Sequence, residues 1–354
     1  MKKVQVVILG NEIEDDHLGW VRACESYRDK VEYRVVNLTS SNWQEEVRRS
    51  DYDIFLAKPG ALTSRYKQLY DERIYILSVL KDSLIFPSPE ELFIYENKRL
   101  LAYWLRANDI PHPVTHIIYD MKEAEAYSKE CELPLVAKTS TGASGSGVKI
   151  LKTRNEIHSY IKKTFTGSGS PQRSGPNLEK GGILARSLHY ISNPSDIMKK
   201  LSLYRVRFEG RQRGFVIFQE YVPHEFEWRV VRIGESFFAH KKIKLKDKAS
   251  GTLLKKYDNP PIRLLDFVKE ITDKHGFYSQ AVDVFDSDHG YLINEMQCIF
   301  GQSDPFQMKV NGIIGRYRDT NGQWLFEPGD WAENMCYNLR LEFILNEHSR
   351  RCRS

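Results

Sequence analysis

The sequence contains no apolar run approaching the roughly 18 residues that a helix needs to cross a bilayer. Its start leads directly into the apolar run 4–9, without the longer apolar core and cleavage site of a signal peptide. The five cysteines are scattered, and none forms a Cys-x-x-Cys pair. A disulfide framework or a zinc site is therefore not expected. We predict a protein of the reducing cytoplasm that binds no membrane.

A strong charge bias is also missing. The net charge is +5 over 354 residues, and no basic run is interleaved with aromatic residues, so we expect no nucleic-acid partner. A mild positive surplus suits a protein that handles ATP and acidic substrates. Hydrophobic residues make up 41% of the chain, which is enough for a sizeable core. The length predicts two or three domains, or one domain with insertions.

The first part of the chain alternates strand-like and helix-like segments. Apolar or β-rich runs at 4–9, 32–38 and 52–57 are followed by helical spacing over 64–80. This alternation predicts a small parallel α/β domain over residues 1–95. A Gly-x-Gly-x-x-Gly pattern is absent after the first strand, which argues against dinucleotide binding there.

The rest of the chain predicts further helices and strands around one unusual segment. Ser88 is expected to cap a helix over 89–108, and Asn321-Gly322 to form a tight hairpin turn. The segment 166–182 is rich in Gly, Ser and Pro and predicts a flexible loop. Strands are expected at 134–138, 148–151, 215–222, 228–233, 236–243, 279–285 and 291–297, and helices at 261–274 and 331–345.

A loop with the composition of a phosphate-binding loop lies between two of these strands. Residues 139–147 contain three glycines and five hydroxyl residues, and Lys138 precedes them. Glycine lets backbone N–H groups approach a ligand, and hydroxyls add donors. The segment is not a Walker loop, because no Gly-Lys-Ser/Thr follows. A flexible hairpin tip remains the alternative.

Two acids set within apolar strands suggest a metal site. If the hairpin pairs Asp286 with Leu292, then Asp283 faces Glu295 directly, and Gln297 shares the face of Glu295. Carboxylates placed opposite each other repel unless a cation lies between them, and Mg²⁺ prefers such oxygen ligands. A solvated sheet edge with ordinary surface acids is the alternative.

Two further strands carry polar residues that suit a nucleotide. An apolar strand over 216–223 turns polar at its end, and the next begins at Glu227. His240, Lys242 and Lys244 alternate and share one face of the following strand, where cations suit phosphates or an acidic substrate. A solvated basic strand explains this row equally well.

Taken in order, these segments resemble the ATP-grasp superfamily over about residues 96–300. Glu96-Asn97-Lys98 followed by 108–115 is similar to the family's lysine helix and its Gly-Ile-Pro-x-Pro-x-Thr segment, with Asp109 in place of glycine. The nearest groups are the ribosomal-protein glutamate ligases and the D-alanine–D-alanine ligases. The resemblance implies an α/β fold in which a small parallel domain precedes a two-lobed ATP-grasp domain over 96–350. Its lid subdomain would span about 113–222.

The resemblance also implies a role for each matched residue. Gln297 replaces the usual asparagine, which puts its role as a direct metal ligand in doubt. Arg229 and Lys242 would be catalytic, with Arg229 stabilising the reacting acyl group. The metal would be held by Asp283, Glu295 and Gln297. The nucleotide would be bound by Lys98, Lys138, Gly142, Ser144, Gly145, Ser146, Gly147, Gln219, Glu220, Tyr221, Val222 and Glu227.

The implied activity is ligation of a carboxylate to an amine or similar nucleophile through an acylphosphate. ATP and Mg²⁺, or Mn²⁺ in its place, would serve as cofactors, with release of ADP and phosphate. The two substrates are not readable, and a homodimer is left open. Two alternatives stand beside this interpretation: a phosphotransferase on the same fold, and a nucleotide-binding protein without turnover.

Overall fold

The computed structural model describes residues 2–49, 52–80, 84–142, 147–170, 211–245, 248–249 and 254–353. Ser144, Gly145 and Ser146 of the predicted phosphate loop, and residues 171–182 of the predicted flexible loop, lie outside these residues. The chain forms two compact units. The first unit comprises Met1–Gly60, Tyr66–Pro113 and Val222–Ser354, and the second comprises Ala61–Arg65 and Val114–Tyr221.

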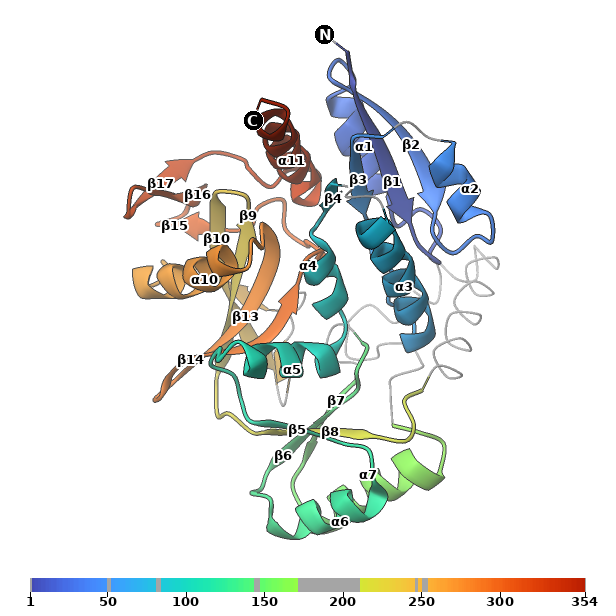
Figure 1. Cartoon of the computed structure of the whole chain (residues 1–354). Coiled ribbons are helices and arrows are strands. Elements are labelled where there is room, and N and C mark those ends of the chain that lie inside the picture. Colours follow the sequence, from blue (N-terminus) through green and yellow to red (C-terminus); the bar gives the residue numbers. More distant parts are fainter. Residues whose placement is uncertain are drawn as a thin grey trace, which may run out of the picture. The chain divides into compact units, whose positions relative to one another are not determined.

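The first unit begins with a parallel sheet in the order β2-β1-β3-β4 (Figure 1). Its strands match the predicted alternation, because fully apolar runs such as β1 and β3 are buried on both faces. The strands are β1 (Val4–Gly10), β2 (Val31–Asn37), β3 (Ile54–Ala57) and β4 (Leu84–Phe86), and the alternating helices are α1 (Leu18–Ser26), α2 (Trp43–Arg48) and α3 (Ser64–Leu80).

Helix α11 (Tyr337–Arg351), near the end of the chain, packs against α1 in the core of the first sheet. The ring of Tyr337 lies edge-on to Trp20 of α1, with 4.9 Å between ring centres, and Leu341 and Ile344 join the same core. The sequence pattern predicts a start at residue 331. The helix begins later because η1 (Glu333–Cys336), a short turn with left-handed backbone, precedes it.

The helix predicted over residues 89–108 is broken into two. Ser88 caps α4 (Pro89–Ile94) with a capping box, as expected from its sequence. Glu96 then adopts a left-handed backbone (φ 49°), and the Asn97 side chain caps a new helix, α5 (Lys98–Ala107). The prediction of one helix is wrong because the apolar spacing continues across this break.

A large antiparallel sheet forms the rest of the first unit. Its strands follow the order β14-β13-β9-β10-β16-β15, with β11 and β12 beside β10 and β17 beside β16 (Figure 1). Helix α10 (Ile262–Lys274) and α5 cover one face through a shared apolar core. The strands are β9 (Phe226–Ile233), β10 (Ser236–Leu245), β11 (Lys248–Ala249), β12 (Lys255–Lys256), β13 (Ser279–Ser287), β14 (Gly290–Gln297), β15 (Lys309–Val310), β16 (Ile313–Thr320) and β17 (Gln323–Pro328).

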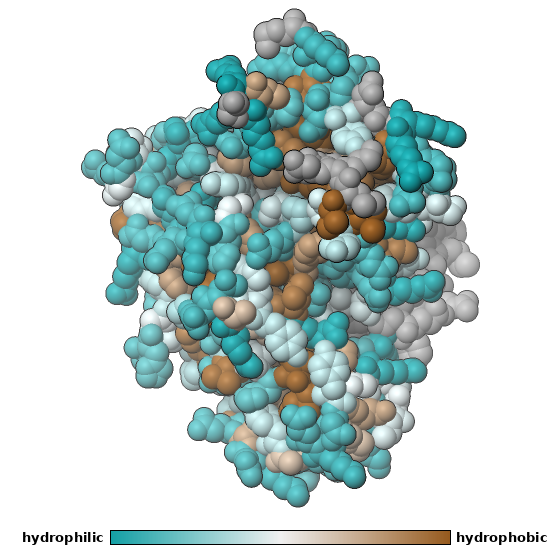
Figure 2. Space-filling model, in the orientation of Figure 1, coloured by the Kyte–Doolittle hydropathy of each residue, from teal (hydrophilic) through white to brown (hydrophobic). Residues whose placement is uncertain are grey.

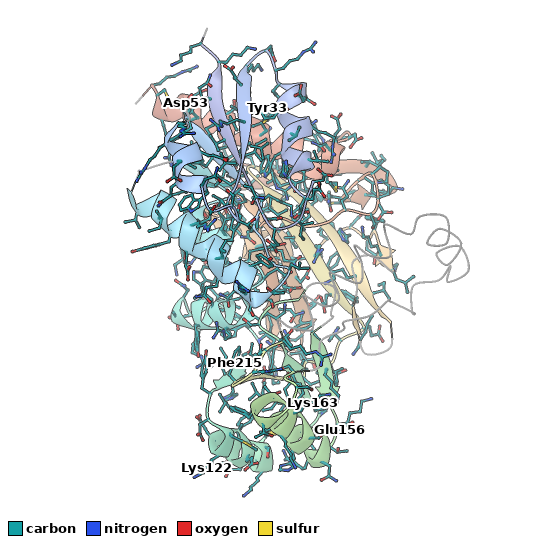
Figure 3. All side chains as sticks on the ribbon, turned by 90° about the vertical axis from the view of Figure 1, so that its right-hand side faces the viewer. Tyr33, Asp53, Lys122, Glu156, Lys163 and Phe215 are labelled. Carbon is teal, nitrogen blue, oxygen red and sulfur yellow. The ribbon has the colours of Figure 1, made fainter. Side chains whose placement is uncertain are left out.

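The second unit is an antiparallel sheet covered by two helices. Its strands run in the order β5-β8-β6-β7, and α6 (Met121–Glu130) and α7 (Arg154–Thr166) pack on the sheet through a core that includes Phe218. Lys122 of α6 and Lys163 of α7 lie on the outer surface of the helices (Figure 3). The strands are β5 (Thr115–Ile118), β6 (Leu135–Lys138), β7 (Val148–Leu151) and β8 (Val216–Glu220).

The hairpin turn at Asn321-Gly322 is confirmed, since both residues have positive φ (55° and 83°), as a tight two-residue turn requires.

On the face shown in Figure 2, hydrophilic residues dominate, and hydrophobic ones form small separate patches. Among the described residues, no helix is long and apolar enough to cross a membrane.

Candidate functional site

A row of four polar residues crosses the large sheet, one from each of four neighbouring strands. Glu295 of β14 lies opposite Asp283 of β13, Asp283 lies opposite Arg229 of β9, and Arg229 lies opposite His240 of β10. Residues directly opposite each other in antiparallel strands point to the same face. The row therefore lies on one face of the sheet, and α10 covers the other.

A β-bulge sets the face on which Glu295 lies. The register shifts by one residue between Asp283 and Val284, so Val284 pairs with Ile293, and Asn294 is the extra residue of the bulge. Ile293 thereby stays in the core beneath α10, while Glu295 is turned to the face of Asp283. Without the extra residue, alternation would have placed both side chains on the same face.

Asp283 lies at the centre of a network of buried charges. Arg229 donates two hydrogen bonds to its carboxylate, from Nε to Oδ1 (2.7 Å) and from Nη2 to Oδ2 (2.9 Å). Lys242 Nζ bridges Asp283 Oδ2 and Glu227 Oε2, at 2.7 Å each. Burial opposes the charge of Asp283, but Arg229 and Lys242 outweigh it and hold the pKa of this carboxyl well below its usual range. Asp283 and its two cations are therefore charged at neutral pH.

The second charged contact joins α5 to the sheet. Lys98 Nζ lies 3.2 Å from Glu295 Oε1. Burial opposes the charge of Lys98, but Glu295 and Glu96 outweigh it and raise the pKa of the lysine. The Gln297 amide donates from Nε2 to Glu96 Oε1 (3.1 Å). The break between α4 and α5 is what brings Glu96 and Lys98 to this edge of the sheet.

His240 differs from the cation suggested by its sequence context. Burial, and then the nearby Arg229 and Lys255, lower the pKa of His240 to about 3, so its ring is neutral. Its Nδ1 bonds to the carbonyl of Gln307 (2.9 Å). The expectation of a row of cations on β10 is therefore wrong at His240 and right at Lys242, where Asp283 and Glu227 stabilise the charge.

The second unit carries the predicted phosphate loop and the hinge residues Gln219, Glu220 and Tyr221, and Val222 begins the next segment of the first unit. Lys138 ends β6 and is buried, and beyond it Thr139 N bonds to the carbonyl of Gly147 (2.9 Å), which closes the base of the loop. At the end of β8, the Gln219 amide donates to Thr115 (2.9 Å), and Glu220 accepts from Val114 N (2.9 Å). The ends of β6 and β8 are therefore held in place by hydrogen bonds within the second unit.

The structure thus brings one subset of the predicted residues together. The first unit gathers Lys98, Glu227, Arg229, Lys242, Asp283, Glu295 and Gln297 on one sheet face or its edge. Glu96 belongs to the sequence motif around Lys98 but is not among the predicted site residues. Its left-handed backbone and its bond to Gln297 mark it as part of this cluster, and no sequence signal indicates that bond.

The donor set fits a magnesium ion completed by phosphates. Among the described residues, no three His, Cys, Asp or Glu side chains gather as a metal cage. Mg²⁺ commonly takes only one or two carboxylates and fills its other positions with water and substrate phosphates. Asp283 and Glu295 lie opposite each other, and Gln297 Oε1 lies on the same face, 3.5 Å from Arg229 Nη2.

Solved structures share this fold along most of the chain. A RimK domain ATP-grasp protein from Sphaerobacter thermophilus is 13% identical and covers 97% of this chain and 100% of its own, with a TM-score of 0.53. D-alanine–D-alanine ligase from Bacillus anthracis is 14% identical, covers 98% of both chains and has a TM-score of 0.53. A carboxyaminoimidazole ribonucleotide synthase from Aspergillus clavatus, solved with ATP, is 11% identical and covers 85% of this chain and 71% of its own, with a TM-score of 0.52. Identities this low establish a common fold and nothing further.

One curated sequence relative matches part of the chain. The carbamoyl phosphate synthase large chain of Methanocorpusculum labreanum is 25% identical over 161 residues, which are 45% of this chain. The matched segment spans only 14% of that protein. No family model matches the sequence.

Proposed function

We propose that this chain, which has the ATP-grasp fold, is a Mg-ATP-dependent ligase that joins a carboxylate to an amine or similar nucleophile. The observation that carries the proposal is the row Glu295–Asp283–Arg229 with Lys242 and Lys98 beside it. Alternating fixed charges of this kind neutralise a phosphoryl group in transfer, and in this reaction the protein mainly positions and neutralises charge. A cytoplasmic location is part of the same proposal.

The proposal assigns roles to residues of each unit. In the first unit, Lys98 and Lys242 bind phosphate oxygens, and Arg229 stabilises negative charge on the acyl group as the acylphosphate forms and reacts. Lys138 and the loop 139–147 bind phosphates, and residues 219–222 contact the adenine. Glu227, buried against Lys242, orients that lysine and contacts the ribose in this proposal.

The metal roles follow from the same cluster. Asp283, Glu295 and Gln297 would hold Mg²⁺, which neutralises phosphate charge when bound. In the present arrangement the cations of Arg229, Lys242 and Lys98 neutralise the two carboxylates. The contacts of Arg229 and Lys242 keep Asp283 ionised, which is the state that a metal ligand requires.

The test is an assay of the full chain with Mg-ATP and pooled substrates, with ADP and free phosphate measured in the same tubes. The pools contain amino acids, small peptides, sugar acids and amines. Equal amounts of ADP and phosphate, formed only when a carboxylate and an amine are both present, are the expected result. Arg229→Met should abolish this turnover, because the acyl group loses its stabilising cation.

Other outcomes would reject the ligase. ADP without free phosphate would identify the phosphotransferase alternative, since the phosphoryl group would then remain on the acceptor. Nucleotide binding without ADP from any pool would favour a protein that binds ATP and does not turn it over. An absence of nucleotide binding, tested by calorimetry with Mg-ATP, would remove the proposal entirely.

A further inference from the structure

Arg340 on α11 is a fully buried cation without an acidic partner among the described residues. Its Nε donates to Ser279 Oγ (2.9 Å), its Nη1 donates to the carbonyl of Met335 (3.0 Å), and its Nη2 has no hydrogen-bond partner in the described part of the chain. The residue is 0% exposed. Guanidinium groups do not lose their proton in proteins, so Arg340 holds a positive charge away from water.

Arg232 shows how the same chain satisfies a buried arginine. It is 1% exposed and, like Arg340, its guanidinium lies over two aromatic rings. Arg232 also forms an ion pair with Asp273 (2.6 Å) and a hydrogen bond with Thr272 (2.7 Å). The two sites are alike in burial and stacking, and they differ in the carboxylate. A buried guanidinium is stabilised by such a partner, and Arg340 lacks one in this region of the structure.

Neither Glu91, which acts on Arg340 electrostatically, nor the acids just before α11 fill this role. Glu91 is fully buried, but its carboxylate accepts from Ser279 N (2.9 Å) and Ser88 N (2.8 Å), and it forms no ion pair with Arg340. Asp330 and Glu333 are exposed, and Asp330 accepts from a backbone N–H. The charge of Arg340 is therefore not neutralised by a direct contact within the described residues.

The N-terminus of α11 adds to the positive charge here. The helix has no side-chain cap and no acid in its first turn, so its dipole is also uncompensated. Asn334, Met335 and Cys336, just before it, all have left-handed backbones (φ 50°, 52° and 62°). Three consecutive non-glycine residues in this region store strain, and such strain often occurs at ligand sites. Arg340 itself holds this turn through the Met335 carbonyl.

We propose that Arg340 and the N-terminal end of α11 bind a small molecule through its carboxylate. A single carboxylate matches the single uncompensated guanidinium and can accept hydrogen bonds from Nη2, whereas a phosphate would bring more negative charge than this site offers. Phe300, stacked on Arg340, is followed by exposed Gly301, where an added β-carbon would meet no other atom within 4 Å. Binding of a carboxylate at Arg340 does not require ATP-dependent turnover.

The experiment measures thermal unfolding and calorimetric binding of the full chain without nucleotide, with sodium acetate as the probe. Sodium chloride and sodium sulfate at the same ionic strength are the reference arms. We expect acetate to raise the Tm of the wild type in proportion to its occupancy, and chloride and sulfate to raise it less. Arg340→Met should weaken acetate binding about tenfold or more, because a charged hydrogen bond is lost.

The variants separate a binding site from a purely structural arginine. In chloride, Arg340→Met should be at least as stable as the wild type, because an uncompensated buried charge is removed. Arg232→Met should be less stable, because the contacts of Arg232 with Asp273, Thr272 and the Gly234 carbonyl are lost, but should keep the response to acetate. If Arg340→Met does not fold, Arg340→Lys retains the charge without the planar fork and should bind acetate more weakly than the wild type. Equal responses to acetate, sulfate and chloride in the wild type, or an unchanged acetate response in the Arg340 variants, would overturn the proposal.

Discussion

Glu96 accepts a hydrogen bond of 3.1 Å from the side-chain amide of Gln297. Because Gln297 Nε2 is the donor, the amide oxygen is left on the other side, where it lies 3.5 Å from Arg229 Nη2. The amide is therefore oriented with its oxygen towards the face of Asp283 and Glu295. The longer arm of glutamine, compared with asparagine, is used to reach Glu96.

This contact predicts that Glu96 positions a metal ligand. Glu96→Ala should weaken binding of Mn²⁺ in the presence of ATP by about ten- to a hundredfold, the usual effect of removing a group that orients a ligand. Glu96→Gln should weaken it less, since its amide oxygen can still accept from Gln297. Electron paramagnetic resonance of free Mn²⁺ measures both. Equal Mn²⁺ affinity in the wild type and Glu96→Ala would show that the contact serves folding only.

Lys138 and Glu295 each test one of the proposed roles. Each alanine variant should lose turnover while keeping the fold. Each substitution removes a charged side chain and leaves the apolar side chains of the core unchanged. Glu295→Ala should also lower the affinity for Mn²⁺, and Lys138→Ala should lower the affinity for ATP without changing metal binding in the absence of nucleotide. Circular dichroism provides the control for folding. Turnover at the wild-type level in either variant would contradict the site assignment.

The sequence predicts the acid pair correctly through a register that is partly wrong. Asp283 does lie opposite Glu295, but Asp286 pairs with Tyr291, and Leu292 pairs with Phe285. The one-residue error at the turn is cancelled by the bulge, which adds one residue to β14. A bulge leaves no mark in the pattern of apolar residues here. The bulge therefore cannot be predicted from the sequence, although the pairing of Asp283 with Glu295 can.

Other features required the three-dimensional structure for a different reason. The break at Glu96 occurs inside a continuous helical pattern, and the neutral state of His240 depends on burial beside Arg229, which only the sheet order reveals. By contrast, the strands of the first sheet and the turn at Asn321-Gly322 follow from local composition, since apolar runs and an Asn-Gly pair determine them directly. The roles assigned to the loop 139–147 and the hinge 219–222 remain predictions.

Gly147 offers a test of the predicted phosphate loop. A β-carbon at this position would lie 1.7 Å from Thr139 Oγ1, which itself donates to the carbonyl of Thr141 (2.7 Å). Gly147→Ala should therefore displace the base of the loop and weaken ATP binding, measured by calorimetry, about tenfold or more. Thr139→Ala removes the clashing oxygen, so the double variant should recover part of the affinity. If Gly147→Ala binds ATP as the wild type does, the loop does not contact the nucleotide.

Glu91 predicts a dependence of stability on pH that is separate from any activity. Its complete burial raises its pKa from 4.5 to about 7, against the opposing hydrogen bonds from Ser279 and Ser88. Between these values the folded chain holds a proton that the unfolded chain has lost, so the free energy of unfolding should fall as pH rises from 4.5 to 7, by about 3 kcal/mol. Glu91→Gln stays neutral and should flatten this slope, whereas Glu130→Gln, at an exposed position, should not. Urea unfolding at a series of pH values measures the difference, and parallel slopes for the wild type and Glu91→Gln would mean that Glu91 is ionised in the folded chain.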